Sequence, residues 1–190
     1  MVTVNKDEYV YILDYLLKGK SEVPLHKRKP LAQAIGESFF SLLELTPKDG
    51  QTFEVGERVY IGEGTRDKVD HIERRIKYDW LTPTAKSEIP DVLNKIVLAR
   101  EADFIKFYNT ASIISTRQHK LEILPRIGKR HRTDILAERD IKPFESFADM
   151  AERVKSMPDP VKVLVDKIKE ELKGESKYYL FVTLKDIRDG

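Results

Sequence analysis

The hydrophobic positions follow two different patterns along the chain. Up to residue 80, apolar residues come in short runs separated by glycine and turn residues, as in YVYILDYLL (9–17), AIGESFFSLLEL (34–45) and GERVYIG (56–62). Their alternation and their content of aromatic and β-branched residues predict short β-strands, with a bulge or bend at Gly36. The segment KVDHIERRIKYDWL (68–81) fits either a strand or a helix, and its place after other strands favours a strand.

A series of short strands broken by glycine is typical of a small β-barrel. We therefore expect residues 1–82 to form an OB-like β-barrel. The stretch KYYLFVTL (177–184) is strand-like as well. Because an isolated terminal strand has nothing to pair with, we expect this stretch to complete the N-terminal barrel.

After Trp80 the spacing of apolar residues becomes helical and stays so as far as Leu172. Helix boundaries are marked by Thr82 before Pro83, by a capping box from Ser146 to Asp149, and by Asp159-Pro160 before the last helix. Residues 83–176 are therefore predicted to form an all-α domain. The fold class expected for the whole chain is α+β, with two domains.

Composition excludes several kinds of chemistry. Without cysteine there is no disulfide, no thiolate nucleophile and no thiolate zinc site. Four histidines without metal-ligand spacing give no reason to expect a metal, and no sequence pattern indicates an organic cofactor. No signal-peptide pattern and no membrane-spanning apolar run is seen, which predicts a cytoplasmic protein without a membrane partner. Abundant charged residues (35%) and few Asn and Gln are typical of a thermophile.

Positive charge is concentrated in one short segment. Residues 111–133 contain six Lys and Arg side chains against Glu122 alone, whereas the whole chain has a net charge of only +2. A run of charge is more often a solvated helix face than a binding site. The sequence at the centre of this run, LPRIGKR (124–130), decides how it is interpreted.

Each residue of this turn has a physical role in the predicted structure. Pro125 ends a helix after Leu124, Ile127 is the apolar plug of the loop, and Gly128 permits a positive φ or a close backbone approach. A second helix follows, and its N-terminal N–H groups and dipole favour an anion. The predicted nucleic-acid-binding residues are Lys120, Arg126, Ile127, Gly128, Lys129, Arg130 and Arg132, of which Ile127 is the plug, Lys120 lies at the edge and the others contact phosphate.

The segment from about residue 117 to residue 139 resembles the helix-hairpin-helix family, whose hairpin usually reads Leu-Pro-Gly-Ile-Gly-Lys. The resemblance implies sequence-independent binding to phosphates of DNA or RNA, with Ile127 as the plug and Gly128 and Lys129 in the contacting turn. One departure is that Arg126 replaces the first hairpin glycine. The alternative is a helix-hairpin-helix that serves only for packing.

The whole chain also resembles an archaeal domain-of-unknown-function family, numbered 655, of nucleic-acid- or nucleotide-binding proteins. The resemblance rests on YVYILDYL (9–16), VGERVYIG (55–62), the hairpin, KPFESFADM (142–150) and KYYLFV (177–182). It implies an OB-like barrel joined to a helix-hairpin-helix unit.

The barrel offers a second candidate surface. Tyr9, Tyr11 and Tyr15 share one face of the first predicted strand, where aromatic rings could stack on unpaired bases. The alternative is that these tyrosines belong to the core. Stacking on unpaired bases would favour RNA over DNA.

The sequence thus predicts a non-enzymatic nucleic-acid-binding protein. A protein-interaction scaffold, in which the basic turn meets an acidic partner, is the first alternative. A base-removing enzyme is a weaker alternative: Asp149 lies at the distance from the hairpin where helix-hairpin-helix glycosylases place a catalytic aspartate, but the capping box also explains it.

Overall fold

The structure is a computed structural model that describes residues 5–183, and the chain folds into two compact units. Among the described residues, the first unit comprises residues 5–92 and 171–183, and the second comprises residues 93–170. The boundary predicted after residue 82 falls at the start of helix α1 (Pro83–Ala99), whereas the first unit continues into this helix as far as Val92.

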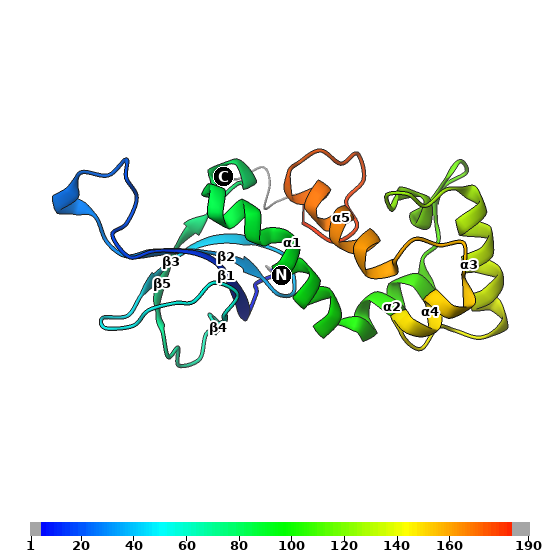
Figure 1. Cartoon of the computed structure of the whole chain (residues 1–190), viewed down its shortest axis with the longest axis horizontal. Coiled ribbons are helices and arrows are strands. Elements are labelled where there is room, and N and C mark those ends of the chain that lie inside the picture. Colours follow the sequence, from blue (N-terminus) through cyan, green and yellow to red (C-terminus); the bar gives the residue numbers. More distant parts are fainter. Residues whose placement is uncertain (1–4, 184–190) are drawn as a thin grey trace. The chain divides into compact units, whose positions relative to one another are not determined.

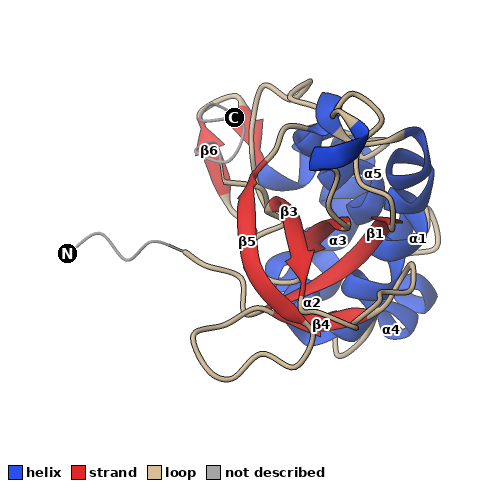
Figure 2. Ribbon diagram, turned by 90° about the vertical axis from the view of Figure 1, so that its left-hand side faces the viewer, coloured by secondary structure: helices blue, strands red, loops and turns tan. Residues whose placement is uncertain are grey.

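Among the described residues, the first unit contains a curled, five-stranded antiparallel sheet in the order β4-β1-β2-β3-β5, which forms a half-barrel (Figure 1). Figure 2 shows the strong curvature of its strands. The strand expected in residues 68–81 is confirmed for Val69–Arg75, whereas Tyr78–Trp80 form a 3-10 helix. The strands are β1 (Tyr9–Leu16), β2 (Leu31–Gly36), β3 (Leu42–Pro47), β4 (Arg58–Tyr60) and β5 (Val69–Arg75).

The bend expected at Gly36 is a full chain reversal between β2 and β3. A carboxylate oxygen of Asp7 accepts the backbone N–H groups of Ser38 and Phe39, at 2.7 and 2.9 Å, and holds this turn. Gly36 lies against the same carboxyl group, since a Cβ atom there would be only 2.0 Å from Asp7 Oδ2. Glycine is needed at this position because of that close approach.

The inner face of the sheet carries the hydrophobic core of the first unit. It consists of alternate residues of the strands together with loop residues: Val10, Ile12, Ala32, Ala34, Leu43, Leu45, Phe53, Val59, Ile61 and Val69.

Two short 3-10 helices interrupt the loops of this unit, Leu25–Lys27 and Tyr78–Trp80. The second leads into α1 and is tied to the sheet by buried Gln33, which donates to the carbonyl of Trp80 (3.0 Å) and accepts from the N–H of Thr82 (2.8 Å). Thr82 caps α1 by accepting the N–H of Ala85 at 3.1 Å, which confirms the predicted helix start.

The strand expected at 177–184 is not found in its described part, residues 177–183. Instead, fully buried Glu171, near the end of α5 (Pro160–Leu172), accepts the backbone N–H groups of Leu180, Phe181 and Val182 at 2.7, 3.0 and 2.8 Å. A carboxylate replaces a neighbouring strand as the partner of these N–H groups. Composition favours a strand but cannot reveal such a partner.

The second unit is mainly helical, as predicted, but it also contains a small β-hairpin. The helix expected to end at Leu124 is absent. In its place, β6 (Ile113–Ser115) pairs with β7 (Gln118–His119), and the 3-10 helix η3 (Lys120–Ile123) follows. β-branched residues in the sequence SIIST (112–116) disfavour a helix and suit a strand. The helices wholly inside this unit are α2 (Glu101–Thr110), α3 (Lys129–Ile141) and α4 (Phe147–Arg153).

Candidate functional site

The basic turn, defined here as residues 124–132, connects η3 to α3. Leu124 and Ile127 are buried, 2% and 5% exposed, so Ile127 is placed as the expected apolar plug. The residue with a positive φ is Arg126 (+63°), not Gly128 (−97°). Arg126 therefore takes the left-handed conformation for which the usual hairpin has glycine.

Two of the predicted phosphate-binding arginines already have carboxylate partners. Arg126 Nη1 lies 2.9 Å from Asp166 Oδ2 on α5, and Arg132 Nη1 lies 3.1 Å from Glu122 Oε2 on η3. Both pairs are partly solvent-exposed. They fix the turn to its neighbours within the second unit, so the same side chains would have to be shared with a bound phosphate.

Lys129 and Arg130 are different. Both are exposed, and in residues 5–183 their side chains form no ion pair or hydrogen bond. They occupy the first turn of α3, where no described residue accepts their backbone N–H groups. Gly128 precedes them, and a Cβ atom there would meet nothing within 4 Å. An anion could approach the start of this 13-residue helix without displacing protein atoms.

Lys120 is the first residue of η3, so the rest of this 3-10 helix separates it from the turn. Its backbone N–H donates to the carbonyl of Ser112 at 3.0 Å, and its side chain is half-buried. The structure thus places Lys129, Arg130 and Gly128 together, and assigns Lys120 to the border of the surface.

An open groove of about 450 Å³ lies between the β6–β7 hairpin and the start of α3. We call it the β6–β7 groove. Among the side chains that line it are Ile113, Arg117, Gln118, His119, Lys129 and Arg132. The sequence prediction missed Ile113 and Gln118 because it treated this segment as a helix. The signal that could have revealed a hairpin was the β-branched run that precedes Arg117.

His119 is one of the residues that line this groove, and it is 6% exposed. Its Nδ1 accepts the backbone N–H of Leu121 at 3.1 Å, which caps η3 and leaves the proton of the neutral ring on Nε2. Burial lowers the pKa of His119, and the positive charges of Arg139 and Arg132 lower it further. At neutral pH the ring therefore presents a fixed Nε2–H donor.

The three tyrosines of β1 do not form one surface. A β-bulge between Ile12 and Asp14 reverses the alternation, so Tyr15 packs against the hydrophobic core, edge-on to Phe53. Tyr9 and Tyr11 remain on the other face. The expectation that all three share a face is therefore wrong, because a bulge shifts every later side chain by one position.

Tyr9 and Tyr11 are also engaged by neighbouring side chains. The guanidinium carbon of Arg58 lies 3.6 Å from the centre of the Tyr9 ring, and the edge of Tyr60 packs against Tyr9. Arg58 is held there by two hydrogen bonds to Glu37, of 3.0 and 2.8 Å. Burial raises the pKa of Tyr11, which is 8% exposed. A base could stack on Tyr9 only after Arg58 had moved.

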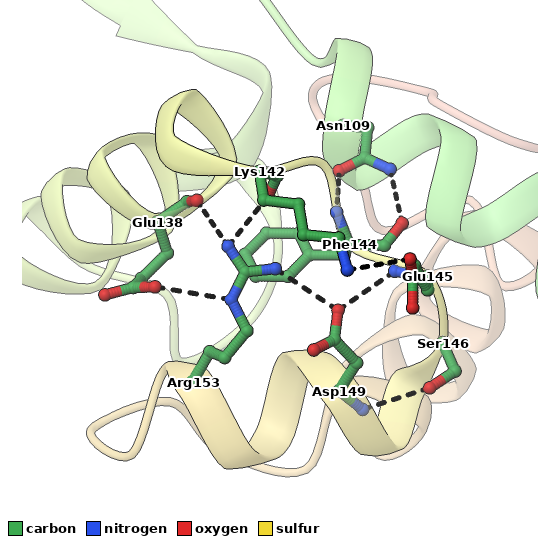
Figure 3. Close-up of polar contacts among 8 residues, drawn as sticks. All are labelled: Asn109, Glu138, Lys142, Phe144, Glu145, Ser146, Asp149 and Arg153. Atoms are coloured by element: carbon green, nitrogen blue, oxygen red, sulfur yellow. Dashed lines mark hydrogen bonds and ion pairs between the residues drawn. The ribbon is translucent and has the colours of Figure 1, made fainter.

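Asp149 takes part in the network of α4 (Figure 3). It lies at the start of the helix, where Ser146 Oγ accepts its N–H at 3.0 Å and its Oδ2 accepts the N–H of Glu145 at 3.0 Å. Arg153 donates to the same oxygen at 3.2 Å. The hydrogen bond from Glu145 and the charge of Arg153 lower the pKa of Asp149. These contacts confirm the helix-start interpretation of Ser146 and Asp149.

Two further kinds of site are absent from the described part of the chain. No group of three or more His, Asp or Glu side chains in residues 5–183 is arranged to hold a metal ion. None of the helices described there has the length and apolar character needed to cross a membrane.

Comparisons with known proteins agree with the two-part α+β fold. The model of a family described as "Protein of unknown function (DUF655)" matches residues 6–183. The uncharacterized protein MJ0038 of Methanocaldococcus jannaschii is 45% identical over 181 residues, which cover 94% of this chain and 81% of that protein. The crystal structure of Af1531 from Archaeoglobus fulgidus, with 43% identity and a TM-score of 0.87, covers 93% of this chain and is itself covered completely.

Proposed function

The chain belongs to the DUF655 family, and on that premise we propose that it is a non-enzymatic nucleic-acid-binding protein that favours RNA over DNA. In this proposal the basic turn binds the phosphate backbone without reading the sequence. The half-barrel corresponds to an OB-like barrel, and the basic turn with α3 corresponds to the second half of a helix-hairpin-helix.

One observation carries the proposal. Lys129 and Arg130 are exposed and, within residues 5–183, have no anionic partner, although many other basic side chains of the same unit are paired. They stand at the N-terminus of α3, where free N–H groups and the helix dipole add to their positive charge. Phosphate is the anion that such a combination of backbone and side-chain donors suits.

The remaining predicted contacts have supporting roles. Buried Ile127 fixes the path of the turn, and the space beside Gly128 is open, since a Cβ atom there would meet nothing within 4 Å. The N–H of Gly128 itself donates to His131 Nδ1 at 3.2 Å, so the free backbone donors are those of Lys129 and Arg130. Arg126 and Arg132 lie in the same turn, and in this proposal each is shared between a bound phosphate and its carboxylate partner, Asp166 or Glu122. Lys120 adds charge at the border.

The decisive experiment measures binding of the purified chain to short single- and double-stranded RNA and DNA by fluorescence anisotropy. Each measurement is made at about 50 mM and about 200 mM salt, a range over which the release of counterions from phosphates weakens binding strongly. The test variant is Lys129→Glu/Arg130→Glu. The matched control is Lys95→Glu/Lys106→Glu, which changes the charge equally at two exposed positions of the same unit.

We expect binding that weakens with salt, is lost in the test variant and is largely kept in the control. The ranking of the four ligands identifies the preferred nucleic acid. No binding to any ligand at low salt would refute the proposal and leave the protein-interaction scaffold as the better interpretation. Equal losses in both variants would show that overall charge, and not the basic turn, is responsible.

A further inference from the structure

The β6–β7 groove contains more than a charged surface. His119 is buried apart from one edge, and it is held in place because its Nδ1 caps η3. In residues 5–183 no group bonds to its Nε2, and this nitrogen is not enclosed by protein atoms. Since His119 is one of the residues that line the groove, Nε2–H is the side-chain donor that this residue can offer to a ligand there.

The groove is also positively charged. Arg117 and Lys129 line it from opposite sides, one from the turn of the hairpin and the other from the first residue of α3. No ion pair of the described residues involves either side chain. Glu122 is the acidic residue of the lining, and its carboxylate is already bound by Arg132 (3.1 Å) and by the N–H of His119 (3.3 Å).

An apolar surface lies beside these donors. Ile113 is 71% exposed and lines the groove, and its neighbour Ile114 is 40% exposed. Isoleucine side chains at the edge of a basic groove suit a ligand that alternates phosphate with apolar rings. A single nucleic-acid strand has this alternation, whereas a duplex conceals its bases.

We propose that the β6–β7 groove binds one backbone phosphate of a single nucleic-acid strand through His119 Nε2–H, Arg117 and Lys129, while Ile113 packs against the adjoining nucleoside. This inference rests on the proposed function and deepens it. In this proposal the basic turn binds the phosphate backbone of any nucleic acid, and the β6–β7 groove adds a preference for an unpaired strand.

Two substitutions of His119 separate its two nitrogens. Asparagine places its oxygen where Nδ1 lies, so His119→Asn keeps the cap on η3 and removes the donor into the groove. Glutamine reaches the position of Nε2, so His119→Gln restores a donor there. Arg117→Gln and Ile113→Ser remove the second cation and the apolar contact, and both positions are exposed. Thermal unfolding of each variant establishes that it is folded.

Binding of a 12-nucleotide single-stranded RNA is then compared with binding of the duplex of the same sequence. We expect His119→Asn and Arg117→Gln each to weaken single-strand binding about 10- to 100-fold, the effect of losing one hydrogen bond to a charged group. His119→Gln should retain more binding than His119→Asn. Ile113→Ser should weaken binding of the single strand but not of the duplex.

The outcomes separate this inference from the proposed function. If the wild type binds RNA and Lys129→Glu/Arg130→Glu abolishes binding, but the His119 and Arg117 variants bind normally, the proposed function stands and the groove has no role. If the wild type binds no nucleic acid, both fail. NMR signals of the His119 ring that shift with inorganic phosphate in that case would mark an adventitious ion only.

Discussion

The guanidinium of Arg126 lies 2.9 Å from the carboxylate of Asp166, so the residue that replaces a hairpin glycine is attached to α5 by an ion pair. Arg126 has a φ of +63°, a conformation that costs a residue other than glycine about 1–2 kcal/mol. A half-exposed ion pair stabilises the folded chain by only about 0–1 kcal/mol. The arginine at this position is therefore not explained by stability alone.

Substitution of Arg126 should depend on backbone conformation. We expect Arg126→Gly to change the free energy of unfolding by less than about 1 kcal/mol, because relief of the left-handed conformation offsets loss of the pair. Arg126→Val should destabilise by about 1–2 kcal/mol, because a β-branched residue tolerates a positive φ poorly. Chemical denaturation measures both.

Asp166→Asn is the control, since it removes the pair without changing the backbone at residue 126. Its effect on stability should stay below about 1 kcal/mol. If Arg126 also binds phosphate, this substitution should strengthen nucleic-acid binding, because a competing carboxylate is lost. Equal destabilisation by Arg126→Gly and Arg126→Val would contradict the role given to the backbone.

Glu171 should be among the residues most important for the stability of the first unit. Its buried carboxylate accepts three backbone N–H groups, and glutamine at this position would turn an amide N–H₂ toward those donors. We expect Glu171→Gln to destabilise by at least about 2 kcal/mol, the usual penalty for leaving buried donors without a charged acceptor. Glu175→Gln, at an exposed position nearby, should change little. Thermal unfolding measures both variants, and equal melting temperatures for Glu171→Gln and Glu175→Gln would contradict the role given to Glu171.

His119 should titrate with a pKa below the ordinary histidine value of 6.5 and remain neutral at pH 7. Burial and the charges of Arg139, Arg132 and Lys120 oppose protonation, whereas Glu122 favours it. Because the pKa of His119 is lower in the folded chain than in the unfolded chain, neutral His119 contributes its full share to the stability of the fold above pH 6.5. That contribution is lost as the pH falls through the pKa of His119 in the folded chain. Ring ¹⁵N NMR should show the Nε2–H tautomer, and a proton on Nδ1 would disprove the capping hydrogen bond to Leu121.

Asp149 and Arg153 should contribute unequally to the second unit. Arg153 donates to the carbonyls of Glu138 and Lys142 as well as to two carboxylates, and it packs over Phe144 (Figure 3). Arg153→Met should therefore destabilise by about 2–3 kcal/mol, because it leaves several acceptors without a donor. Asp149→Asn should have a much smaller effect than Arg153→Met, since an amide oxygen can still accept the N–H of Glu145.

The same Asp149→Asn variant tests the enzymatic alternative. A catalytic aspartate cannot be replaced by an amide, so a base-removing enzyme would lose its activity while remaining folded. Release of free base from damaged DNA or RNA would be measured with the wild type and the variant. Activity that the wild type shows and Asp149→Asn lacks would contradict the purely structural role that the contacts of Asp149 indicate.

Local pattern determined much of this protein. The strand character of β1, β4 and β5, the helix starts at Thr82 and Ser146, the α+β class and the burial of Ile127 all follow from short-range rules of alternation, capping and helical period. The run 34–45 is expected as one segment with a bend, but it forms parts of two strands, β2 and β3. These rules act between residues close in the sequence, so the sequence contains them directly.

Tertiary structure decided the rest. The bulge in β1 separates Tyr15 from Tyr9 and Tyr11, and composition gives no sign of where such a residue is inserted. Glu171 binds the backbone N–H groups of residues 180–182 in place of a strand, and Asp166 and Glu122 form ion pairs with two of the predicted contacts. Which donors and cations remain unpaired, as at His119, Lys129 and Arg130, depends on partners far along the chain that only folding brings near.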